Sequence, residues 1–100
     1  MPQVKAKKTI KNEVYMKLKK IFNLKNCFIK VSYVENETEG SVQFHITIVI
    51  ERMNLTVRSC SSVKNELLDI NTLSDDIVED VKNSVNRAVN EFIYSGKETK

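Results

Sequence analysis

The sequence has few of the residues that break regular structure, with two glycines and one proline among its 100 residues. Gly40 and Gly96 stand far apart, so the chain has no glycine-rich phosphate loop, and the common nucleotide-binding motifs are excluded. No stretch approaches the ~20 apolar residues of a membrane span. The 41% share of hydrophobic residues indicates one compact domain rather than a disordered tail.

Cysteine and histidine are also scarce, which limits the chemistry that they can support. Cys27, Cys60 and the single His45 show no metal-ligand spacing, so we expect neither a metal nor a cofactor. The N-terminus lacks the apolar segment of a secretion signal, so we expect a cytoplasmic protein with reduced thiols. No acid, base and nucleophile can be placed together from spacing, and no small-molecule substrate is indicated. We therefore expect a nonenzymatic protein.

Acidic side chains are nearly absent from the first 30 residues, which hold nine lysines and one carboxylate, Glu13. The rest of the chain holds seven basic and twelve acidic side chains, so the net charge of +3 conceals a division by position. This division indicates that function lies in an electrostatic surface rather than in a reactive group.

The basic segment is predicted to form a mobile arm followed by a helix. Residues 1–8 are polar and lack an apolar period, so we interpret them as a flexible arm. Thr9 is placed to cap a helix in which apolar residues recur at helical spacing. These residues are Ile10, Val14, Tyr15, Leu18, Ile21 and Phe22. Glu13 and Lys17 have the spacing of a favourable i,i+4 ion pair.

Strands are predicted in the middle of the chain. Residues 42–51 alternate between apolar and more polar side chains, which is typical of a strand with one buried and one wetter face. Another strand is expected over residues 27–34, before a polar turn. Residues 55–60 are predicted to form the third strand.

The last two strands are predicted to form a hairpin with a reversal at residues 52–53. A two-residue loop pairs Ile50 with Leu55. The same register pairs Ile48 with Val57, which keeps apolar residues on one side of the sheet. A longer or bulged turn is also compatible with this sequence.

A long helix is predicted at the C-terminal end, after residues 61–73, whose structure the sequence leaves open. Ser74 is its expected N-cap and Gly96 its expected terminator. Its apolar stripe comprises Ile77, Val81, Val85, Ala88, Val89 and Phe92. We interpret the carboxylates in its first turns as charges that stabilise the helix start; they are Asp75, Asp76, Glu79 and Asp80.

The order helix, strand, strand, strand, helix predicts an α+β fold. We expect a two-layer sandwich, with a three-stranded antiparallel sheet and both helices on one of its faces. A single domain would span residues 9–96, between the basic arm at 1–8 and a frayed tail at 97–100.

This order resembles that of double-stranded RNA-binding domains over nearly the whole chain. Those domains have a lysine cluster at the start of the second helix, where this chain has Ser74, Asp75 and Asp76. The order is also similar to that of ribosome-hibernation factors without their first strand. Neither resemblance includes a functional motif, so neither assigns a function.

Two surfaces are candidates for function, and the sequence leaves both open. The first is a set of lysines that could contact phosphates of nucleic acid or of a ribonucleoprotein: Lys5, Lys7, Lys8, Lys11, Lys17, Lys19, Lys20 and Lys25. Without arginine, aromatic or amide readers, such a set favours nonspecific contact, and it can also serve solubility alone. The second is the outer sheet face, which could bind a protein partner or a second copy of the chain through Phe28, Lys30, Gln43, His45, Val49 and Arg58. Such a polar and weakly basic face could also bind single-stranded nucleic acid, but no aromatic pair is exposed on it to stack bases.

Overall fold

The computed structural model describes residues 2–23 and 25–98, with side chains for 6–23, 25–69 and 71–93. The elements are helix α1 (Pro2–Ile21), strands β1 (Cys27–Asn36), β2 (Ser41–Ile50) and β3 (Leu55–Lys64), and helix α2 (Ile70–Glu98). Two short 3-10 helices, η1 (Glu51–Met53) and η2 (Asn65–Leu67), flank β3. The predicted order and the α+β class are confirmed.

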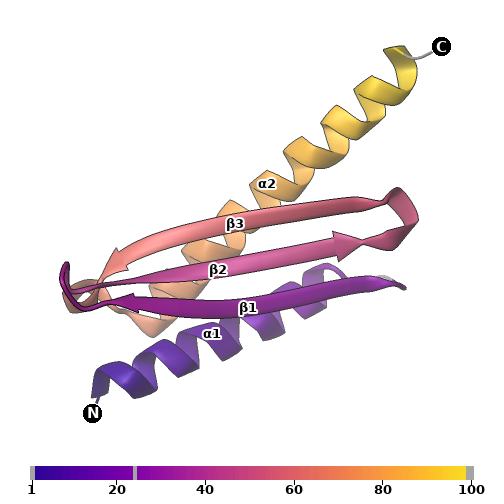
Figure 1. Ribbon diagram of the computed structural model, residues 1–100. Coiled ribbons are helices and arrows are strands. Elements are labelled where there is room, and N and C mark those ends of the chain that lie inside the picture. The colour runs from indigo at the N-terminus through magenta and orange to yellow at the C-terminus, as the bar shows by residue number, and fades with distance from the viewer. Residues whose placement is uncertain (1, 24, 99–100) are drawn as a thin grey trace.

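The strands form one antiparallel sheet in the order β1-β2-β3, and both helices lie on the same face of it (Figure 1). Helix α1 packs against β1, α2 packs against β3, and the two helices contact each other. The predicted two-layer sandwich is therefore confirmed. Neither helix, as far as the structure describes it, combines the length and the apolar content needed to cross a membrane.

Strand β2 forms the centre of the core because its side chains alternate between the two sheet faces. Phe44, Ile46 and Ile48 point toward the helices and are almost completely buried. The predicted hairpin register is confirmed, with Ile50 opposite Leu55. The helices pack against the inward side chains of β2. Helix α1 contributes Ile10, Val14 and Leu18 to the core, and α2 contributes Ile77, Val78, Val81 and Val85.

The turn between β2 and β3 is longer than the two residues first considered. Residues 51–53 form the 3-10 helix η1, and Asn54 closes the turn in the left-handed region at φ 49°. Its N–H donates to the carbonyl oxygen of Glu51 at 3.0 Å. Asparagine tolerates this backbone conformation better than most residues, so Asn54 supplies the reversal that Arg52 and Met53 do not favour.

Helix α1 begins at Pro2 rather than after Thr9, so residues 2–8, which were expected to form a flexible arm, are helical. Proline suits the first turn of a helix, where its missing N–H would have no partner. Lys7 also continues the inward stripe one turn before Ile10, and it is buried. A lysine at an inward position hides the apolar period, which is why the sequence suggested a later start.

Both ends of α2 also differ from the prediction. Asp69 caps its start, because the carboxylate Oδ1 accepts hydrogen bonds from the backbone N–H groups of Asn71 and Thr72 at 3.1 and 3.4 Å.

Helix α2 does not end at Gly96 but continues to Glu98. Its 29 residues correspond to roughly 43 Å at the rise of an α-helix. Figure 1 shows its C-terminal half extending past β3, and the molecule measures 55 × 26 × 18 Å.

Several apolar residues that were expected in the core are exposed. Phe92 belongs to the predicted stripe of α2 but is 48% exposed, and it lies in the C-terminal half of the helix, which extends past β3 (Figure 1). Ile21 stands at the last position of α1 and is 45% exposed. Tyr15 lies on the border of the buried face and is 36% exposed.

Replacing Ile46 with alanine should lower the free energy of unfolding by about 2–5 kcal/mol, because the cavity would open in the middle of the central strand. Ser62→Ala, at an exposed position of the same sheet, should change it by less than about 0.5 kcal/mol. Urea denaturation followed by circular dichroism measures both. Equal effects of the two substitutions would contradict this assignment of the core.

Candidate functional site

The predicted lysine set divides into residues that face solvent and residues that hold the fold together. Lys8, Lys19, Lys20 and Lys25 are exposed, and Lys11 is half-buried. Within the described residues, none of these five forms an ion pair with a carboxylate. We call these five residues the α1 lysine surface. Lys5 lies in α1, but its side chain is outside the described part of the structure.

Lys7 is not available to a partner because it is buried between α1 and the sheet. It is 4% exposed, and its Nζ donates to Oε1 of Glu35 on β1 at 2.6 Å. A lysine can bury its aliphatic stem while its ammonium group reaches a more polar neighbour. Lys7 therefore fastens the N-terminal half of α1 to the end of β1.

Lys17 is also engaged within the molecule, and it joins the two helices. Its Nζ donates to Oγ of Ser74 at 3.0 Å and to Oδ1 of Asp75 at 2.5 Å. The predicted ion pair of Lys17 with Glu13 is therefore wrong. Ser74 is fully buried and also donates to the carbonyl oxygen of Asn71 at 3.2 Å, so the first turn of α2 is held against α1 through this serine.

Tyr15 is a surface feature that the sequence reading assigned to the core. The Nζ of Lys19 lies 5.8 Å from the centre of the Tyr15 ring, within the range of a cation–π contact. Lys8, Lys11, Tyr15 and Lys19 are three or four residues apart, so they follow one side of α1. This spacing was readable in the sequence, but it was obscured by the assignment of Tyr15 to the apolar stripe.

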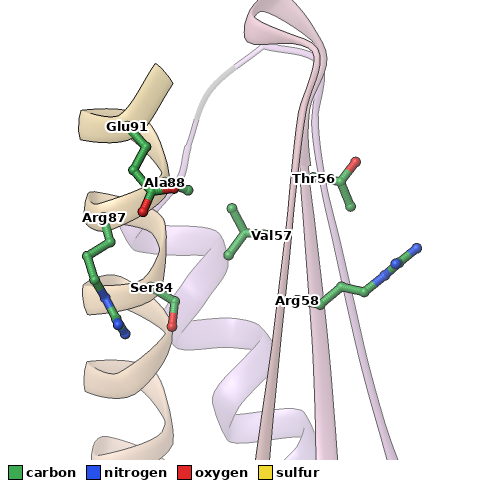
Figure 2. A pocket seen from close by; sticks show the side chains of 7 residues that line it. All are labelled: Thr56, Val57, Arg58, Ser84, Arg87, Ala88 and Glu91. Atoms are coloured by element: carbon green, nitrogen blue, oxygen red, sulfur yellow. The ribbon is translucent and has the colours of Figure 1, made fainter. Parts of the chain in front are cut away.

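The second candidate surface is the face of the sheet opposite the helices. The paired registers place the predicted residues together on it, in rows that cross the strands. Phe28 lies opposite Val49, which lies opposite Thr56, and the next row is Lys30, Thr47 and Arg58. The two rows after that are Ser32, His45, Cys60 and Val34, Gln43, Ser62. Figure 2 shows Val57 pointing toward α2, with Thr56 and Arg58 on the opposite side of β3.

The outer sheet face carries no carboxylate at any of its strand positions, all of which the structure describes. Its charged residues are Lys30 and Arg58 in one row and Lys64 at the end of β3. Glu35 is on the helix-facing side of β1 and is paired with Lys7. The open face therefore carries positive charge in two of its five rows and negative charge in none of them.

The acidic residues predicted at the start of α2 lie on the exposed side of that helix. Asp75, Asp76, Glu79 and Asp80 are all exposed, and Asp75 is the residue that pairs with Lys17. Oε2 of Glu79 lies 3.7 Å from Nζ of Lys82, which makes an i,i+3 ion pair. Because α2 begins at Ile70 and has no acidic residue in its first turn, the interpretation of these four carboxylates as helix-start charges is wrong.

Cys60 lies opposite His45, as the predicted register requires. Cys27 is on the helix-facing side of β1, so the two free thiols lie on opposite faces. Burial raises the pKa of the Cys27 thiol, and the charge of Lys19 offsets part of this rise. Among the described residues, no group of three or more His, Cys, Asp and Glu side chains could hold a metal ion.

A hollow of about 300 Å³ lies between β3 and α2 (Figure 2). Val57 and Ala88 line its inner part. Arg87 and Glu91 on α2 provide a positive and a negative group one helical turn apart. Thr56 and Arg58 of the outer sheet face also line the hollow, so it adjoins that face at the β3 edge.

Comparisons with protein-family models, with curated proteins and with solved structures found no match.

Lys7→Ala should lower the free energy of unfolding by about 1–3 kcal/mol, because it removes a buried stem and the hydrogen-bond partner of Glu35. Lys8→Ala removes the same side chain from the next, exposed position and should cost less than about 0.5 kcal/mol. Urea denaturation of the two variants compares them directly. If both lose the same stability, Lys7 does not fasten α1 to the sheet.

Proposed function

We propose that this chain is a small nonenzymatic binding protein of the cytoplasm that contacts nucleic acid, free or in a ribonucleoprotein, through the α1 lysine surface. The observation that supports the proposal is that Lys8, Lys11, Lys19, Lys20 and Lys25 have no ion-pair partner among the described residues. Glu13 is the one acidic residue in α1. A phosphate backbone approaching this helix therefore meets ammonium groups with little opposing charge.

The spacing of these lysines suits an extended polyanion better than a small anion. From Lys8 to Lys19 the helix rises by roughly 16 Å, so the ammonium groups can contact several phosphates in succession. Lysines act as point charges and do not read base edges as bidentate groups do. The expected binding is nonspecific in sequence and steeply dependent on salt.

Polyanion binding should weaken about 50- to 130-fold between about 50 and 200 mM salt, if four or five phosphates of a single strand are neutralised. The double variant Lys8→Gln with Lys19→Gln should bind more weakly and should reduce the slope of log affinity against log salt by about 1.4. Fluorescence anisotropy with labelled RNA and DNA measures both quantities.

A matched control is the double variant Lys82→Gln with Arg87→Gln on α2, which removes the same amount of charge from the other helix. It should bind as the wild type does. Absence of binding by the wild type, binding that is insensitive to salt, or equal losses in both double variants would each contradict the proposal.

A second candidate function is a protein-interaction module, which includes self-association. It is favoured by Phe92 and Ile93, which are 48% and 46% exposed on the part of α2 that extends past the sheet (Figure 1). Light scattering during the same experiments distinguishes the candidates. A mass above the 11.5 kDa of one chain, without nucleic-acid binding, would favour the second candidate.

A further inference from the structure

Phe28 is placed unusually for an aromatic residue on an open sheet. It stands at the edge of the outer face, on strand β1, and is 56% exposed. Its cross-strand neighbour Val49 is half-buried, and Thr56 follows in the same row. An exposed ring supported by an aliphatic neighbour offers a platform on which a planar group can stack.

The row next to Phe28 supplies positive charge on both sides of a hydroxyl group. Lys30 and Arg58 flank Thr47. Neighbouring strands are about 4.8 Å apart, so the backbones of the two basic residues lie about 10 Å from each other. Because no strand residue on this face carries a carboxylate, the charges of Lys30 and Arg58 are unopposed on it and complement a polyanion.

The outer face and the α1 lysine surface meet at the turn that joins α1 to β1. Lys25 is exposed in this turn. Asn26 adopts the left-handed conformation at φ 59°, and its carbonyl oxygen accepts a hydrogen bond from the N–H of Glu51 at 3.1 Å. This bond ties the turn to the end of β2. Lys25 thus lies between the lysines of α1 and the row that begins with Phe28, at an edge strand that no other strand covers.

We propose that the nucleic acid bound by this protein is single-stranded, and that it passes from the α1 lysine surface over the edge of β1 onto the outer face. There Phe28 stacks on an unpaired base while Lys30 and Arg58 contact phosphates. This inference rests on the proposed function and adds the class of nucleic acid to it. Single strands are favoured because the bases of a duplex are stacked on one another and do not offer a free face to the ring.

The same charges argue against a second copy of the chain as the occupant of this face. A two-fold contact between two outer faces would bring basic residues together, because each face contributes Lys30, Arg58 and Lys64 and no carboxylate. Such a contact is not complementary in charge.

The test compares a fluorescein-labelled oligouridine of about 20 nucleotides with its duplex with oligoadenosine, by anisotropy at low salt. The wild type should prefer the single strand. Phe28→Ala should weaken single-strand binding about tenfold, and duplex binding by less than about twofold. Phe28→Tyr keeps a stacking ring and should retain the affinity. Val34→Ala is the control, because Val34 is 55% exposed on the same strand and face and cannot stack.

The outcomes separate this inference from the proposed function. Binding of both probes with equal affinity, with no effect of Phe28→Ala, would overturn the single-strand inference and leave the lysine surface intact. Absence of binding to both probes would overturn both proposals. Polyglutamate serves as a further probe: competition as strong as that of unlabelled oligouridine would indicate an acidic protein as the partner and would overturn the inference. Circular dichroism of each variant establishes that it is folded.

Discussion

The strict alternation of β2 is the constraint on which the rest of the structure depends. Its inward side chains form the middle of the core, and they are covered by both helices from one side only. A three-stranded sheet with helices on one face necessarily leaves the other face in water. The polar and basic residues between the apolar positions therefore become a continuous surface across three strands. Stability and the candidate binding surface are consequences of the same alternation.

The division of charge along the chain is reorganised by folding rather than preserved. Lys7 and Lys17 come from the basic segment, but they bind Glu35 and Asp75 from the acidic remainder. These two contacts fix α1 against β1 and α2. Lys8, Lys19 and Lys20 keep their charge exposed on α1, and the outer face of the sheet adds Lys30 and Arg58. The acidic face of α2 stays exposed beyond the Lys17 contact, so the molecule presents surfaces of opposite sign.

Much of the fold could be predicted because its signals are local. The alternation of β2 fixed the register from Ile50 opposite Leu55 onward, and the spacing of Val14 and Leu18 located the buried face of α1. Contacts between distant segments escaped prediction. Lys7 lies inward and pairs with Glu35, which is 28 positions later in the chain. Lys17 pairs with Asp75, which is 58 positions later, and not with Glu13. Phe92 is exposed in the half of α2 that extends past β3 (Figure 1), which no local period reveals. The candidate lysine set consequently included Lys7 and Lys17, which are engaged within the molecule.

The most direct test of the account is a titration of the isotopically labelled protein with oligouridine, followed by two-dimensional NMR of the backbone amides. The account predicts that the largest shift changes map to the exposed side of α1, to Lys25 and Asn26, and to the first half of β1 around Phe28 and Lys30. The amides of α2 from Asp75 to Glu91 should change little. Shift changes concentrated on α2, or an unchanged spectrum at low salt, would contradict the claim that the basic surface around the edge of β1 binds nucleic acid.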